Sequence, residues 1–307
     1  MDLSFGAEYD EFRAEVKQFI AEKSDKSPKQ AGVGNSEAIA WQKTLINNGY
    51  AARTIPTEYG GFGAEPDIIE SRIIAEEFSN AQLSTGLGGQ GISMLTPVLL
   101  EMGTEEQKQQ FIKPTIHGEM IWCQGYSEPG AGSDLASLIT SAVRDGDDYL
   151  INGSKIWTSY AHHSNMIFCL VRTSKEGRPQ AGISFILVDM ATEGLKVEPI
   201  VGLDGTVEQC QVFFDNVRVP VGNLLGAENQ GWDVAKSLLE FERGGHNFTI
   251  DHKKQMAKIV QQAASQWDSD NRPWKDNPVF SAKLADVAVD ALALEFTELR
   301  VKGAFEA

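Results

Sequence analysis

Two short segments carry the residue types best suited to hold a cofactor. The first, SEPGAGSD at 127–134, places Gly130 and Gly132 on either side of an alanine. Backbone N–H groups beside such small residues are open to close approach, so phosphate oxygens can reach them. Ser133 adds a hydroxyl donor. A glycine-rich turn between two strands would have the same composition, and this alternative stays open at this point.

The second segment is KIWTSY at 155–160. Trp157 offers a flat apolar face, and Thr158 and Ser159 offer hydroxyl and N–H groups. Together they could stack on a flavin ring and hydrogen-bond to its reactive edge. The alternative is a tryptophan in the core of a sheet beside solvated hydroxyls.

A third segment, LLEFERGG at 238–245, brings charge into an apolar helix. Glu240, Glu242 and Arg243 interrupt the apolar pattern. Charges on such a face need either partners or a ligand. A buried Glu–Arg pair, or ion pairs at a subunit interface, would satisfy them equally well.

Composition limits the classes of ligand. The chain has 307 residues and a net charge of −16, which argues against nucleic acid as a partner. An anionic ligand must therefore be met by local cations or backbone N–H groups. No apolar run approaches the roughly 20 residues that a membrane span needs, and the N-terminus lacks the pattern of a secretory signal.

The cysteines and histidines indicate no metal site. Cys123, Cys169 and Cys210 are far apart in the sequence and are expected to be buried, small apolar side chains. This usage fits a reducing compartment, so we expect a cytoplasmic protein or one from another reducing, soluble compartment. His162 and His163 have no partner at ligand spacing.

Periodicity divides the chain into three stretches. Residues 1–118 repeat apolar side chains at helical spacing and predict an all-helical domain. Residues 119–226 hold short β-branched runs separated by turn pairs such as Asn152-Gly153, which predict an antiparallel sheet or barrel. Helical spacing returns over 227–307, which we expect to be a partial, truncated helical bundle, because two helices alone leave apolar faces open. The predicted fold class is α+β, multidomain.

Six segments in register resemble the acyl-CoA dehydrogenase family. They are IPTEYGGFGA at 55–64, the run at 91–108, WCQGYSEPGAGSD at 122–134, NGSKIWTS at 152–159, FFDNVRVP at 213–220 and FER at 241–243. They extend across almost the whole chain. The resemblance implies an N-terminal helical domain, a central β domain and a C-terminal four-helix domain, with FAD between the last two. The chain holds about half of the third domain.

The resemblance also implies roles for individual residues. The flavin contacts that it implies are Tyr126, Ser127, Gly132, Ser133, Trp157, Thr158 and Ser159. Ser133 further lies near the path of the CoA thioester, and Arg243 matches an arginine that meets the CoA portion. In the isovaleryl- and long-chain-type members the catalytic base stands just before this arginine, which makes Glu242 the candidate base.

The function implied is FAD-dependent dehydrogenation of an acyl-CoA to a trans-2-enoyl-CoA, as in fatty acid β-oxidation. Electrons would pass to an electron-transfer flavoprotein, and the expected assembly is a homo- or hetero-tetramer. Two alternatives remain: a flavin oxidase or monooxygenase relative, and a non-catalytic or site-sharing subunit of a heteromeric enzyme. The sequence does not give the length or shape of the acyl group.

Overall fold

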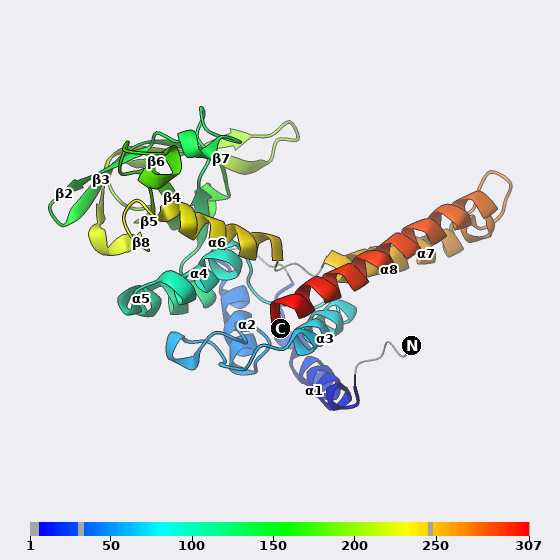
Figure 1. Cartoon of the computed structure of the whole chain (residues 1–307). Helices are drawn as coiled ribbons and strands as arrows, with labels where there is room; N and C mark the ends of the chain where they lie inside the picture. The colour runs from blue at the N-terminus through cyan, green and yellow to red at the C-terminus, as the bar shows by residue number, and fades with distance from the viewer. Residues whose placement is uncertain (1–5, 30–33, 245–247, 307) are drawn as a thin grey trace. The chain divides into compact units, whose positions relative to one another are not determined.

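The computed structural model describes residues 6–29, 34–244 and 248–306, without the side chains of 243, 244, 248 and 302–306 (Figure 1). Contacts group the chain into two compact units. The first unit joins residues 1–29, 64–85 and 246–307, and the second joins 30–63 and 86–245.

The helices follow the apolar spacing of the sequence. They are α1 (Glu8–Lys23), α2 (Ser36–Asn47), α3 (Ile68–Asn80), α4 (Thr96–Met102), α5 (Glu105–Ile116), α6 (Gly231–Gly244), α7 (Phe248–Ser265) and α8 (Pro278–Glu306). The side chains of Asn35, Asp67 and Thr104 accept backbone N–H groups at the starts of α2, α3 and α5. Such caps satisfy N–H groups that have no partner within the helix.

The first unit is helical, and α7 and α8 form a long hairpin in it (Figure 1). A group of charged side chains ties this hairpin to α3. Arg72 of α3, only 4% exposed, donates to Glu295 of α8, and Lys253 of α7 lies 2.5 Å from the same carboxylate. A buried carboxylate needs such partners, because leaving water without them costs several kcal/mol.

The second unit is built on one sheet. Its strands are β1 (Trp122–Gly125), β2 (Ser141–Asp145), β3 (Asp148–Ser159), β4 (Met166–Arg172), β5 (Ile183–Asp189), β6 (Leu195–Val201), β7 (Val207–Pro220) and β8 (Leu224–Leu225). The strand order is β6-β7-β3-β2-β4-β5-β8, with β1 paired to β4.

The sheet is mixed, whereas the sequence predicted an antiparallel one. Most neighbours are antiparallel, but β1 and β2 each pair with β4 in the parallel sense. Short turns force antiparallel pairing only between strands that they join, and a long connection separates each of these strands from β4. The predicted turn at Asn152-Gly153 is also wrong. It lies inside β3, where the register with β7 shifts and Gly153 has a φ of 144°.

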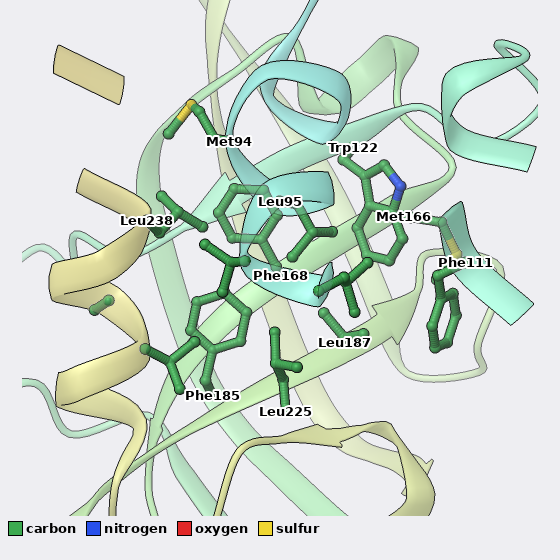
Figure 2. Close-up of a cluster of buried hydrophobic side chains, with 14 of the residues drawn as sticks. Met94, Leu95, Phe111, Trp122, Met166, Phe168, Phe185, Leu187, Leu225 and Leu238 are labelled. Atoms are coloured by element: carbon green, nitrogen blue, oxygen red, sulfur yellow. The ribbon is translucent and has the colours of Figure 1, made fainter. Parts of the chain in front are cut away.

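Both faces of the central strands are buried. Alternate residues of β4 and β5 pack into one cluster with side chains of β2, β3 and β7, so the sheet folds around an apolar interior. The other face of β4 and β5 packs against α4, α5 and α6 (Figure 2). There the rings of Phe168 and Phe185 stack at 5.7 Å, and Leu238 of α6 covers them. This second cluster packs α6 against the sheet.

The fold class predicted from the sequence is confirmed in its main features: N-terminal helices, a central sheet and C-terminal helices. The three-segment domain division stays a prediction. All three cysteines are unpaired and buried, as expected. In the described part of the chain no helix is both long and apolar enough to cross a membrane.

Candidate functional site

The loop at 126–134 leaves β1 and closes as a tight turn. The backbones of Glu128 and Ala131 exchange hydrogen bonds of 2.9 and 3.0 Å around a Pro-Gly pair. A side chain added at Gly130 or Gly132 would meet no atom within 4 Å. The backbone here is therefore open to an incoming group, which binding of phosphate oxygens requires. The exposed Ser133 follows directly.

A buried ion pair fixes this loop to β3. The Nζ atom of Lys155, which is fully buried, lies 2.8 Å from the carboxylate of Glu128 and 3.1 Å from the carbonyl oxygen of Tyr126. The same carboxylate accepts the backbone N–H groups of Ile139 and Thr140 at 2.7 and 2.9 Å. One carboxylate thus joins the loop, the approach to β2 and the middle of β3.

The ionised forms of both partners depend on each other. Burial lowers the pKa of Lys155, and the nearby Glu128 carboxylate opposes that effect. Burial alone would raise the pKa of Glu128, but the Lys155 ammonium and the N–H of Ile139 bring it below its ordinary value. Removing one partner would leave the other charge buried and uncompensated.

Beside the loop, β3 turns a tryptophan outward. The N–H of Ile156 donates to the Ser127 carbonyl at 2.9 Å, which brings the loop next to Trp157. The register between β3 and β7 shifts between Lys155 and Thr158, and Trp157 takes a φ of 59°, rare for a bulky residue. Its side chain is 61% exposed. A core tryptophan, the alternative considered from the sequence, is therefore excluded.

The two hydroxyl residues after Trp157 face different ways. Thr158 is 1% exposed, and its Oγ1 is buried without a hydrogen-bond partner among the described residues. Ser159 is half-buried and exchanges hydrogen bonds with the side chain of Gln209, the shorter at 3.1 Å.

A cavity of about 340 Å³ adjoins Ser159. The segment at 87–91, which contains Gly88 and Gly89, forms one wall. Ser159, Tyr160 and His163 line it from the end of β3 and the turn that follows. A side chain at Gly88 or Gly89 would meet nothing within 4 Å, so open space adjoins both glycines.

The charged end of α6 lies near the start of the loop. Burial raises the pKa of the Tyr126 hydroxyl. The nearby Gln124 side chain lowers this pKa, and the negative charge of Glu242 raises it. The hydroxyl itself has no hydrogen-bond partner among the described residues. Glu242 is exposed. The backbone of Arg243 belongs to α6, but its side chain lies outside the described residues.

The structure thus brings together most of the residues singled out in the sequence. The loop at 126–134 and the strand at 157–159 are adjacent, and Glu242 acts electrostatically on Tyr126. Tyr126 is buried, and its side chain packs edge-on against Phe168 in the core. The roles assigned to these residues stay predictions.

The sequence did not predict the Glu128–Lys155 ion pair or the glycine-rich segment at 87–91 that lines the cavity. A lysine inside a β-branched strand is a weak signal of burial, and the partner of Lys155, Glu128, lies 27 positions away in the sequence. The glycines at 86, 88, 89 and 91 were visible as a cluster, but only the fold shows that they border a cavity. Among the described residues, no group of three His, Cys, Asp or Glu side chains is arranged to hold a metal ion.

Comparison with known proteins matches two family models to the chain. The acyl-CoA dehydrogenase N-terminal domain matches residues 6–119, and the acyl-CoA dehydrogenase middle domain matches residues 123–217. The chain is 37% identical over 265 residues to acyl-CoA dehydrogenase IpdE1 of Mycobacterium tuberculosis. This match covers 83% of the chain and 68% of IpdE1, so the chain spans about two thirds of that relative.

Solved structures resemble the chain over nearly its full length. The ChsE4-ChsE5 complex from Mycobacterium tuberculosis superimposes with a TM-score of 0.82 at 29% identity, covering 99% of this chain and 78% of the matched one. The Tcur3481-Tcur3483 steroid ACAD gives a TM-score of 0.78 at 31% identity, covering 100% and 78%. With both family models matched in order and a relative of this similarity, the chain belongs to the acyl-CoA dehydrogenase family.

Proposed function

We propose that this protein is an FAD-dependent acyl-CoA dehydrogenase that forms a trans-2-enoyl-CoA from an acyl-CoA thioester. The observation that supports this most is that a carboxylate, an open loop and an exposed indole lie close together. The charge of Glu242 acts on Tyr126, the residue from which the open loop at 126–134 begins, and that loop adjoins the exposed indole of Trp157. A carboxylate, a flat apolar face and an open backbone are the three parts that this chemistry requires.

The residues present fit a flavin dinucleotide. The exposed Trp157 gives a surface for a tricyclic ring, and the half-buried Ser159 nearby gives a polar contact. The open backbone at Gly132 and the hydroxyl of Ser133 would receive the pyrophosphate. FAD, when bound, supplies the acceptor for the hydride that leaves the β-carbon.

Glu242 is the proposed base that takes the α-proton of the thioester. A carboxylate removes such a proton more readily once an acyl group excludes water from it, because lost solvation raises its proton affinity. Glu242 lies on the last turns of α6, and its exposure leaves it accessible to substrate. Arg243 is the proposed contact to the CoA portion.

Replacing Glu242 with Gln tests the assignment. Removal of a general base should lower kcat by about 100-fold or more while flavin content stays normal. The measurement is anaerobic bleaching of flavin absorbance by an acyl-CoA. The matched control is Glu240→Gln, two residues earlier on the same helix and also exposed. Near-normal turnover in the Glu242 variant would remove this residue from the role.

We further propose that the acyl group is bulky or ring-bearing. Gly88 and Gly89 place no side chains in the wall of the cavity of about 340 Å³, which Ser159 and Tyr160 also line. A structurally similar protein is a steroid ACAD, which supports a substrate class of this kind. A panel of linear, branched and polycyclic acyl-CoAs, assayed with an artificial electron acceptor, tests it.

The proposed electron acceptor is an electron-transfer flavoprotein, because two electrons must leave the site after each turnover. We propose a tetrameric assembly in the cytoplasm and a role in fatty-acid or related lipid oxidation. Oxygen consumption equal to product formation would point instead to an oxidase.

A second candidate function is favoured by the same comparisons. Two of the similar structures are complexes of two different chains, ChsE4-ChsE5 and Tcur3481-Tcur3483. The chain would then be a subunit that shares its site with a related chain. Expression alone without flavin, followed by flavin binding and activity on addition of a copurifying chain, would support this function over the first.

A further inference from the structure

One buried hydroxyl group in the apolar cluster under α6 has no acceptor. Tyr126 directly follows β1 and is 7% exposed, and its Oη atom has no hydrogen-bond partner among the described residues. Its ring packs edge-on against Phe168 and Phe185, with the ring centroids 6.1 and 6.3 Å apart. A phenylalanine could make both ring contacts without burying an unpaired polar atom, which destabilises a fold. The hydroxyl of Tyr126 therefore needs an explanation.

The neighbouring Gln124 does not use the phenolic proton. The Oε1 atom of Gln124 accepts the Nε2 of Gln90 at 3.4 Å. Burial raises the pKa of the Tyr126 hydroxyl, and the Gln124 side chain lowers it, which is the effect of a donor near the phenolic oxygen. A donor at that oxygen leaves the O–H proton available. Because burial is the larger effect, Tyr126 stays protonated at neutral pH and can donate.

Helix α6 brings a carboxylate to the same cluster. Leu238 of α6 is fully buried there with Tyr126, and Figure 2 shows Leu238 beside Phe168 and Phe185. Glu242 follows Leu238 by four residues, so the two side chains lie on one face of the helix, one turn apart. The Glu242 side chain therefore leaves the helix on the face that covers the cluster.

An electrostatic effect agrees with this placement. The negative charge of Glu242 raises the pKa of the Tyr126 hydroxyl, after the larger effects of burial and of Gln124. The interaction between two groups weakens with distance and is screened by water, so the effect indicates proximity. Among the described residues that act on this hydroxyl, Glu242 is the only carboxylate.

The other acids on the neighbouring helices point elsewhere. Glu101 of α4 accepts the hydroxyl of Ser237 at 2.9 Å. Glu240 is exposed and precedes Glu242 by two residues, which turns it about 200° around α6. The segment at 91–95, which also packs against α6, has no charged side chain. Glu242 is thus the acid placed to meet the phenolic proton.

The strands under α6 add no competing acceptor. β4 and β5 have their charged side chains at their ends, Arg172 and Asp189. The Arg172 guanidinium donates to backbone carbonyl groups, and Asp189 is exposed. Cys169, in the middle of β4, is neutral at working pH because burial raises the pKa of its thiol to about 12.

We propose that Tyr126 is a positioning residue, whose hydroxyl donates to the Glu242 carboxylate when an acyl-CoA is bound. In the structure Glu242 is exposed, and a bound acyl group would displace water and turn its side chain toward the cluster. The hydrogen bond would fix the carboxylate in one orientation and stabilise its ionised form, which a base requires. The inference rests on the proposed function, in which Glu242 is the base.

Tyr126→Phe tests the proposal because it keeps the ring and removes only the hydroxyl. Loss of a donor raises the proton affinity of a carboxylate, so the acid limb of the kcat–pH profile should move up by about one pH unit. On that limb kcat should fall roughly tenfold, whereas flavin content should not change. The measurement is turnover of an acyl-CoA with an artificial electron acceptor across the acidic range. An acid limb in its original place would overturn the proposal.

Thermal unfolding separates a positioning role from a structural one. The Tyr126 hydroxyl has no partner in the ligand-free chain, so its removal should leave Tm unchanged or slightly raised. Tyr59→Phe is the matched control, since Tyr59 is buried in the same cluster and donates to Glu105 at 3.0 Å. That variant should lower Tm and leave the pH profile in place. A lowered Tm with an unchanged profile in Tyr126→Phe would make the residue structural and overturn the proposal.

A measurement that needs no turnover completes the design. Infrared spectra of the flavin-loaded protein, saturated with an enoyl-CoA, follow ionisation of the Glu242 carboxyl, whose band is assigned by its absence from Glu242→Gln. The titration midpoint should lie about one pH unit higher in Tyr126→Phe than in the wild type. Equal midpoints would overturn the proposal. If the wild type oxidises no acyl-CoA, the proposed function fails, while the infrared titration still decides whether Tyr126 contacts Glu242.

Discussion

At the scale of single residues, Lys155 holds the proposed phosphate loop in position. Its replacement by Met would leave the Glu128 carboxylate buried without a cation, and should lower the free energy of unfolding by about 3–5 kcal/mol. Urea denaturation measures this. Replacing both residues with Met should recover much of the loss, because an apolar pair is tolerated where a lone charge is not. A single variant as stable as the wild type would contradict the role of the pair.

The same pair predicts a pH dependence. The pKa of Glu128 is lowered from its ordinary value of 4.5, so its stabilising contribution is fully present above that value and disappears as pH falls through the lower folded-state pKa. The stability gap between the wild type and Glu128→Gln should therefore be widest near neutral pH and narrow in acid. Denaturation curves at several pH values check this. A stability difference between the two proteins that grew below pH 4.5 would contradict the predicted direction of the pH dependence.

At the scale of elements, the sequence predicted the helices well but the sheet less well. Helix spacing and caps such as Thr104 are local features, so they can be read directly. Asn152-Gly153 has the composition of a turn and of a bulge alike, and only pairing with β7 decides between them. Parallel pairing of β1 with β4 depends on a distant strand.

The candidate site divides in the same way. The open loop and Trp157 could be found from residue types alone, because small residues and an aromatic beside hydroxyls are local signals. The buried partners of the loop could not be found in this way. Lys155 reads as an ordinary strand residue until its burial is known.

The wall at 87–91 gives a prediction at this scale. Gly88→Val should add bulk to the open cavity and lower kcat/KM for polycyclic acyl-CoAs by about tenfold or more, with little effect on butyryl-CoA. Gly222→Val is the matched control, since Gly222 also has open space around it and lies outside this cavity. A uniform loss for all substrates would mean that the wall does not select the acyl group.

At the scale of the whole molecule, α8 exposes an apolar stripe. Val289, Leu292 and Phe296 are spaced as one helix face and are 66%, 50% and 38% exposed. Exposed apolar stripes of this kind favour association. Val289→Glu with Leu292→Glu should therefore shift the protein toward a smaller species in sedimentation velocity. An unchanged sedimentation coefficient, with the wild type already monomeric, would contradict this expectation.

The three buried thiols give the folded chain an unusual practical property. Burial raises the pKa of Cys123 and brings that of Cys169 to about 12, so neither is a reactive thiolate at neutral pH. All three sulfur atoms lie within the sheet interior. Maleimide should consequently label the native protein very slowly and react with three equivalents once urea opens the sheet. Mass spectrometry of that labelling would time the opening of this region without any introduced probe.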